Sequence, residues 1–213
     1  MEKLIILGAG GHAKSVIDTL RQLKCFEIVG MLDKKEKIGN TIEGIPIIGA
    51  DKDMLQYYEQ GIKCMFIGVG SLGDTKLRCR LYDEAKKIGF KFPSIIDTTA
   101  IVSSNVIVDE GCYIGKGSVI NTGSRIGKQC IVNTGAIVEH DCNIDEFVHI
   151  GPRAVLSGNV QVGAHTHIGV NSTVIQGIHI GEHTLIGAGS VVVKDIGSYK
   201  KAYGNPCKVV EEG

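Results

Sequence analysis

The stretch IGKGSVINTGSRIGKQCIVNTGAIV, residues 114–138, repeats one pattern every six residues. Each hexad opens on Ile or Val, continues with Gly or Asn, and carries a small residue four places after its opening. Stepping by six in both directions gives seventeen opening positions, all of them aliphatic: Ile96, Val102, Val108, Ile114, Ile120, Ile126, Val132, Val138, Ile144, Ile150, Leu156, Val162, Ile168, Val174, Ile180, Ile186 and Val192.

A six-residue period is too long for the alternation of a strand and does not match the 3.6-residue turn of an α-helix. It matches a short strand followed by a corner, three of which close a triangular coil of about 18 residues. The aliphatic residue of each hexad then points into the coil, where burial of each one contributes roughly 1.5–3 kcal/mol. The repeat therefore predicts a prism of parallel strands that needs no disulfides.

The composition is that of an ordinary soluble globular protein, with 43% hydrophobic and 22% charged residues. Lys and Arg together number 23, as do Asp and Glu. A net charge of zero gives no reason to expect nucleic acid or a membrane surface as a partner. Gly is frequent, at 29 residues, and aromatic residues make up only 5%. Such a composition matches many tight turns around a narrow aliphatic core.

The N-terminal stretch MEKLIILGAGGHAKSV contains a short apolar run, Leu4 to Leu7. This run is too short for a signal peptide or a membrane span, so we expect a cytoplasmic protein. The seven Cys residues include no C-x-x-C pair, which argues against a disulfide framework or a structural zinc site.

Residues 1–95 show a different pattern, typical of a small βαβαβ unit. KLIILGAGGHAKSVIDTLRQL predicts a strand, a Gly-rich turn and an amphipathic helix. FEIVGMLD and KCMFIGVG predict two further strands, and residues 74–87 predict a second helix.

The Gly-rich turn is a candidate phosphate site. A helix that starts after Gly8, Gly10 and Gly11 offers backbone N–H groups and a positive dipole end to a phosphate. Asp33 ends the second strand, where such folds hold a ribose hydroxyl. A dinucleotide site for NAD is one interpretation, but a unit this small has more room for a mononucleotide. In a third interpretation, the glycines only pack the strand against the helix.

The two parts together resemble the sialic acid O-acetyltransferase / UDP-4-amino-sugar N-acetyltransferase family of hexapeptide-repeat enzymes. The matching motifs are GAGGH, LD after the second strand, IGVG after the third, VEHDCNIDEFVHIG in the repeat, and YGNPCK, where Cys207 replaces the usual Ala. The resemblance spans essentially the whole chain. It implies an α/β Rossmann-like nucleotide-sugar-binding domain over residues 1–95. It also implies a left-handed parallel β-helix acetyltransferase domain with a C-terminal tail over residues 96–213, and a homotrimer.

The resemblance also implies three groups of site residues. The nucleotide of the acceptor sugar is expected to contact Gly10, Gly11, His12, Asp33, Lys34 and Gly68. Acetyl-CoA, the implied acetyl donor, is expected to lie along the β-helix in a groove between subunits, against His149, Gly158, Val170 and Ala188. His140 and Asp141 match the catalytic pair of the family.

Glu139, His140 and Asp141 stand side by side in the hexad that Val138 opens. The repeat places them outward or at a corner, so a solvated charged corner is the simplest interpretation of the repeat alone. Acetyl transfer to an amine needs a base, because a protonated amine does not attack a thioester. His exchanges protons near pH 7, and a neighbouring carboxylate fixes its tautomer. With the resemblance, we predict His140 as the general base and Asp141 as the residue that tunes it.

Two other chemistries have less support in the sequence. Cys142 could form an acyl-enzyme intermediate. However, Cys112, Cys130 and Cys142 all hold the small inward place of a hexad, which indicates inert core residues. Some hexapeptide proteins bind zinc through an H-x-x-x-x-H spacing, but no two of the seven His residues here are five positions apart. We therefore expect no metal site.

These observations predict an acetyl-CoA-dependent N-acetyltransferase. Its acceptor is expected to be the 4-amino group of a nucleotide-linked amino-dideoxy sugar, acetylated by direct transfer. Two alternatives stay open: O-acetylation of sialic acid, and a non-catalytic trimer that binds a nucleotide sugar.

Overall fold

The computed structural model describes residues 1–212, which form two compact units. Met1–Gly70 and Lys76–Ile95 make up the first unit. Ser71–Thr75 and the chain from Ile96 onward make up the second. No helix in the described part of the chain is long and apolar enough to cross a lipid bilayer.

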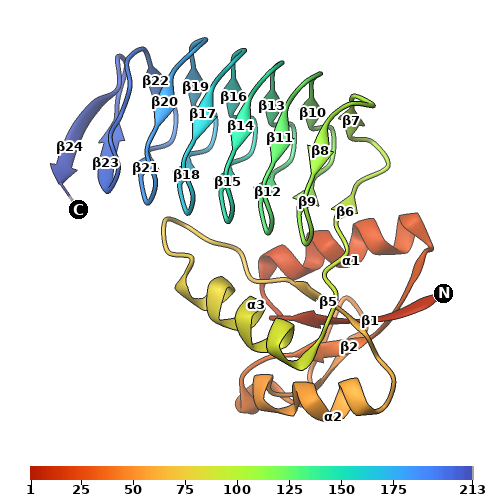
Figure 1. The fold of residues 1–213 in the computed structure, drawn as a ribbon. Coiled ribbons are helices and arrows are strands. Elements are labelled where there is room, and N and C mark those ends of the chain that lie inside the picture. Colours follow the sequence, from red (N-terminus) through yellow and green to blue (C-terminus); the bar gives the residue numbers. More distant parts are fainter. Residues whose placement is uncertain (213) are drawn as a thin grey trace. The chain divides into compact units, whose positions relative to one another are not determined.

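The first unit is a five-stranded sheet with helices beside it (Figure 1). The strand order is β3-β4-β2-β1-β5, and β3 runs antiparallel to β4 while the other neighbours are parallel. The elements are β1 (Glu2–Leu7), α1 (Gly11–Leu23), β2 (Phe26–Leu32), η1 (Lys35–Lys37), β3 (Thr41–Ile42), β4 (Ile45–Gly49), η2 (Asp51–Asp53), α2 (Met54–Glu59), β5 (Cys64–Ile67) and α3 (Lys76–Ile88).

Burial explains why these segments form this unit. β1 from Leu4 onward and the whole of β5 are apolar and buried, as expected for parallel strands that are covered on both faces. The predicted apolar face of α1 is buried at Val16, Ile17 and Leu20. The expected three strands and two helices are present. The structure adds β3, β4 and α2 between residues 34 and 63, where short apolar segments around Pro46 give no sustained period.

The second unit is the parallel β-helix that the repeat predicts, and its coils follow one another from β6 to β23 (Figure 1). The first face consists of β7 (Ile101–Val102), β10 (Val119–Ile120), β13 (Ile137–Val138), β16 (Val155–Leu156), β19 (Thr173–Val174) and β22 (Val191–Val192). The second face consists of β8 (Ile107–Val108), β11 (Arg125–Ile126), β14 (Asn143–Ile144), β17 (Gln161–Val162) and β20 (His179–Ile180). The third face consists of β6 (Ile95–Ile96), β9 (Tyr113–Ile114), β12 (Ile131–Val132), β15 (His149–Ile150), β18 (His167–Ile168), β21 (Leu185–Ile186), β23 (Lys200–Tyr203) and β24 (Lys208–Glu212).

The hexad openings form the core, which confirms the interpretation of the repeat. Every opening residue from Ile114 to Val192 exposes 1% or less of its surface. Val102 and Val108 are only partly buried, because they lie near the first coil, where no complete coil precedes them. Since side chains alternate along a strand, the residue before each opening faces outward.

Many corners between strands adopt a left-handed backbone conformation. In the column between the first and second faces, Asp141, Asn159 and Gly177 have φ angles of 60°, 58° and 71°. Gly, Asn and Asp are the residues that adopt this conformation most readily. His140 and Asp141 therefore lie at a corner, on the outside of the prism.

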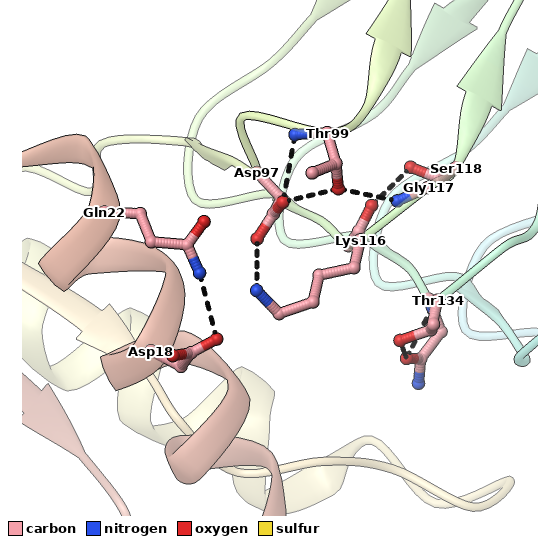
Figure 2. Close-up of polar contacts among 10 residues, drawn as sticks. Asp18, Gln22, Asp97, Thr99, Lys116, Gly117, Ser118 and Thr134 are labelled. Atoms are coloured by element: carbon pink, nitrogen blue, oxygen red, sulfur yellow. Dashed lines mark hydrogen bonds and ion pairs between the residues drawn. The ribbon is translucent and has the colours of Figure 1, made fainter.

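A buried carboxylate organises the first coil (Figure 2). The side chain of Asp97 is fully buried, and its Oδ1 accepts hydrogen bonds from the Thr99 backbone N–H at 3.0 Å and hydroxyl at 2.7 Å. Lys116 Nζ lies 3.2 Å from its Oδ2. Gly117 N–H in turn donates to the Thr99 hydroxyl. These contacts join the first coil to the second, where the repeat has no preceding strand to pair with.

The Ser71–Thr75 segment belongs with the β-helix, although the sequence prediction assigned all of residues 1–95 to the first domain. The Ser71 carbonyl accepts a hydrogen bond from His149 Nδ1 at 2.7 Å. The Thr75 hydroxyl lies 2.9 Å from His165 Nδ1. These two contacts explain the difference, since they attach both ends of the segment to the β-helix. The first unit ends at Ile95, and the continuous β-helix begins at Ile96.

Candidate active site

The first unit contains a cavity of about 300 Å³ at the carboxyl ends of β1, β2 and β5. Open parallel sheets bind ligands at such carboxyl ends. The cavity brings together all six residues that the sequence predicts for the nucleotide: Gly10, Gly11, His12, Asp33, Lys34 and Gly68. Sequence reasoning missed Lys37, Leu77 and Arg80, which also line it and come from η1 and α3. The Gly-rich turn leads directly into α1, so the helix N-terminus opens onto the cavity.

Asp33 holds the Gly-rich turn in place. Its Oδ2 accepts a hydrogen bond from the Ala9 N–H at 2.6 Å and lies 3.0 Å from Lys37 Nζ. Its Oδ1 accepts a hydrogen bond from the Lys34 N–H. Burial by itself raises the pKa of Asp33, but the contacts with Lys34, Lys37 and Ala9 outweigh it and bring the pKa below its ordinary value. The carboxylate is therefore charged at neutral pH and part of the wall of the cavity.

His140 and Asp141 form an exposed pair at the corner between β13 and β14. His140 Nδ1 lies 2.9 Å from Asp141 Oδ2, and the two side chains are 57% and 65% exposed. Because an ionised carboxylate only accepts hydrogen bonds, Nδ1 carries the proton and Nε2 of the neutral ring keeps its lone pair. This is the arrangement that a general base needs. Glu139 turns back toward the His140 backbone N–H at 3.4 Å.

A second cavity, of about 260 Å³, lies on the third face of the β-helix. It brings together three of the four residues that are predicted to contact acetyl-CoA: His149, Val170 and Ala188. Leu72 and Leu185 also line it, so its surface is mainly apolar. The fourth residue, Gly158, is not among the residues that line this slot, because it follows β16 at the same corner column as His140.

Both ring nitrogens of His149 have partners. Nδ1 donates to the Ser71 carbonyl, and Nε2 lies 3.2 Å from the amide nitrogen of Asn133. The tautomer is thereby fixed, with the proton on Nδ1. Sequence reasoning missed Asn133, although it stands in the VNTG stretch, because Asn is also an ordinary residue at that place of a hexad.

His167 lies beside His149 on the third face, one coil further along the β-helix. Its ring lies 4.8 Å from that of His149 in an edge-to-face arrangement. Its Nδ1 is buried and has no hydrogen-bond partner in the structure. Burial lowers the pKa of His167, so the ring is neutral at pH 7.

The His140 corner and the His149 slot lie on opposite sides of the prism. His140 lies between the first and second faces, while His149 lies on the third face. In a triangular cross-section each corner is opposite one face, and the aliphatic core fills the space between them. One acetyl group therefore cannot touch both residues of the same chain.

The three cysteines of the repeat are core residues, as predicted. Cys112, Cys130 and Cys142 expose 1% or less of their surfaces. The Cys142 thiol lies 3.2 Å from the Ser157 carbonyl, and burial raises its pKa. A buried thiol with a raised pKa is a poor nucleophile. Across residues 1–212, no group of three or more His, Cys, Asp or Glu residues is placed to hold a metal ion.

A Gly-rich cavity on a small parallel sheet, followed by a hexapeptide β-helix with an exposed His–Asp pair, defines a hexapeptide-repeat transferase. Comparison with protein families gives a match for each part of the chain. The PglD N-terminal domain matches residues 3–85, and the hexapeptide repeat of succinyl-transferase matches residues 105–140 and 159–194. The chain belongs to the hexapeptide-repeat acetyltransferases that carry a PglD-type N-terminal domain. This confirms the resemblance seen in the sequence.

Solved structures agree with this family over nearly the full length. Perosamine N-acetyltransferase from Caulobacter crescentus, crystallised as a histidine variant with CoA and GDP-perosamine, is 36% identical with a TM-score of 0.92. The match covers 99% of this chain and 98% of that one. The acetyltransferase domain of PglB from Neisseria gonorrhoeae FA1090, in complex with acetyl coenzyme A, is 33% identical with a TM-score of 0.91. That match covers 98% of this chain and 99% of that one.

A curated viral relative matches about half of this chain and a small part of its own length. Uncharacterized protein L142 of Acanthamoeba polyphaga mimivirus is 34% identical over 109 residues, which is 51% of this chain. The match spans only 20% of the length of that relative.

Proposed function

We propose that the protein transfers the acetyl group of acetyl-CoA to the 4-amino group of a nucleotide-linked amino-dideoxy sugar. The observation that carries this proposal is the first-unit cavity, where the six residues that the family resemblance implies for the nucleotide line one space at the carboxyl ends of three strands. The similar enzyme from Caulobacter crescentus was crystallised with GDP-perosamine, a nucleotide-linked amino sugar. The phosphates of the acceptor lie at the start of α1, and its ribose lies near Asp33.

The mechanism is direct transfer with His140 as general base. Nε2 of His140 takes a proton from the sugar amine as the amine attacks the thioester carbonyl, and CoA leaves as the thiolate. Asp141 holds the proton on Nδ1 and stabilises the imidazolium that forms. Cys142 takes no part, because its thiol is buried and its pKa is raised.

Acetyl-CoA lies against the third face, where His149, Val170 and Ala188 line the slot. The slot is mainly apolar, which matches the aliphatic parts of a pantetheine arm. Since His140 and Gly158 lie on the opposite side of the prism, the slot of one subunit faces the His140 corner of another. The site is then completed only in an oligomer.

The outward columns of the β-helix support a homotrimer. The outward residues of the first face are Ile101, Val119, Ile137, Val155, Thr173 and Val191. The outward residues of the second face are Ile107, Arg125, Asn143, Gln161 and His179. The first column is β-branched and nearly all apolar, whereas the second is mostly polar. A continuous apolar column of this kind marks an interface, and here we assign it to a second copy of the chain.

The test is a thiol-release assay with acetyl-CoA and a panel of UDP-, GDP- and dTDP-linked 4-amino sugars, with free sialic acid included. We expect a nucleotide-linked amine to be preferred over sialic acid by orders of magnitude, because binding of the nucleotide positions the amine. Equal acetylation of free sialic acid would replace the proposal with O-acetylation. Absence of thiol release with the whole panel would favour a non-catalytic trimer.

A further inference from the structure

The His140–Asp141 pair lies between two glycines of the neighbouring coils. Gly158 follows His140 by one coil, and Gly123 precedes Asp141 by one coil. A Cβ atom built on Gly158 lies 2.5 Å from both Cε1 and Nε2 of His140. A Cβ atom built on Gly123 overlaps Oδ1 of Asp141. The imidazole and the carboxylate thus occupy space that any other residue at these two positions would fill.

We propose that Gly123 and Gly158 are positioning residues, which hold the His140–Asp141 pair in its working geometry because they have no side chains. This inference rests on the proposed role of His140 as general base. It differs from the predicted contact of Gly158 with acetyl-CoA, because it assigns Gly158 an effect on the base rather than on donor affinity.

The physical argument is steric. Cβ contacts shorter than 3.0 Å essentially do not occur in proteins, so a side chain at either position moves its neighbour. His140 is an exposed side chain at the end of two rotatable bonds, so the ring turns aside more easily than the backbone moves. The ring then loses its 2.9 Å contact with Asp141, and Nε2 no longer faces the amine. A misplacement of about 1 Å in a reacting group costs roughly 10²-fold in rate.

The direct test is Gly158→Ala, since Gly158 does not have the left-handed φ angle that disfavours alanine. We expect kcat to fall roughly 10²-fold while the KM values for both substrates and the melting temperature stay unchanged. Gly197→Ala is the matched control, because Gly197 also lacks a left-handed φ and a Cβ there meets nothing within 4 Å. Full retention of kcat in Gly158→Ala would overturn the proposal. A raised acetyl-CoA KM at unchanged kcat would also overturn it, in favour of donor contact.

Gly123 requires a substitution that tolerates its φ of +74°. Asn is suitable, because Asn159 occupies the same corner column at φ 58°. Gly123→Asn is expected to lower kcat by displacing Asp141. Gly177→Asn is its control, since Gly177 lies in the same column at φ +71° with open space around its Cβ position. Equal activity of these two variants would contradict the role of Gly123.

A double-mutant cycle separates this inference from the proposed function. If Gly158 acts through His140, adding Gly158→Ala to His140→Ala should cause no further loss. Two losses that add fully would overturn the positioning role. If His140→Ala alone keeps full activity, the proposed base is wrong. A crystal structure of Gly158→Ala then still decides the steric inference, according to whether the imidazole has moved away from Asp141.

Discussion

The two sides of the β-helix place histidines in opposite settings on the same repeat. His140 lies at a corner, is mostly exposed, and contacts one carboxylate. His149 lies on the third face, is 93% buried, and has a partner at each ring nitrogen. An exposed ring with one free nitrogen can accept a proton from a substrate. A buried ring with partners at both nitrogens can only contribute to the lining of a binding site. The repeat determines the position of each residue in the coil, and the neighbouring groups determine whether its side chain can act chemically.

Removal of the exposed histidine should have the largest effect on activity and so tests this difference most strongly. His140→Ala should lower kcat roughly 10²–10⁴-fold, because proton transfer is lost while the core is untouched. The variant should keep the oligomeric state and melting temperature of the wild type. His179→Ala is a matched control, since His179 is an exposed outward residue of the second face. A large fall in melting temperature of His140→Ala would show a structural role instead.

A change in the first-unit cavity should leave both histidine sites intact. Asp33→Ala should raise the KM for the nucleotide-linked acceptor about tenfold or more, while the KM for acetyl-CoA changes little. Asp33→Asn keeps the size of the side chain and should have a smaller effect, because its amide oxygen can still accept from the Ala9 N–H. Steady-state kinetics with each substrate varied in turn measures both. Equal increases in the two KM values would show that Asp33 does not serve the acceptor alone.

The buried His167 on the third face should make the stability of the fold sensitive to acid. Burial lowers the pKa of His167, so protonation is less favourable in the folded state than in the unfolded state. The folded state should therefore lose stability as the pH falls below about 6.5, the ordinary His pKa, toward the lowered value. In His167→Gln, the fall in melting temperature between pH 7.5 and pH 5.5 should be smaller than in the wild type. An unchanged pH dependence would contradict this assignment.

The smallest effect is expected at Cys142, next to the His140 corner. Cys142→Ala should keep activity within a few-fold of the wild type, because the buried thiol takes no part in transfer. A modest loss of stability is expected from the shortened core side chain. Near-complete inactivation of a folded variant, or a trapped acetyl-enzyme in the wild type, would restore the covalent mechanism.

The sequence predicted the β-helix well because its period is strict. Each hexad opening from Ile114 onward is buried, and the inward Cys residues follow the same rule. The front domain was predicted in outline from the Gly-rich turn and the alternation of strands and helices. β3, β4 and α2 were missed, because their short segments have no sustained period.

The candidate sites depend on contacts that a linear pattern does not contain. The contacts of His149 with Asn133 and Ser71 join residues 16 and 78 positions apart. Contacts of this kind also group the Ser71–Thr75 segment with the β-helix. Gly158 was predicted to contact acetyl-CoA in a groove between subunits, and the coil geometry places it against His140 of its own chain. The likeness to the family supplied the candidate residues, but only the fold shows which side of the prism each one faces.

The central claim is that the transfer site combines the His140 corner of one subunit with the His149 slot of another. Mixing subunits tests it most directly. The His140→Ala and His149→Ala variants, each expected to be weakly active alone, would be unfolded together, refolded as a mixture, and assayed with acetyl-CoA and the preferred nucleotide-linked amine. If each site needs one side from each of two subunits, random mixing should restore activity to about a quarter of that of refolded wild type. Activity no higher than the mean of the two parent variants would contradict the claim and place the complete site within one chain.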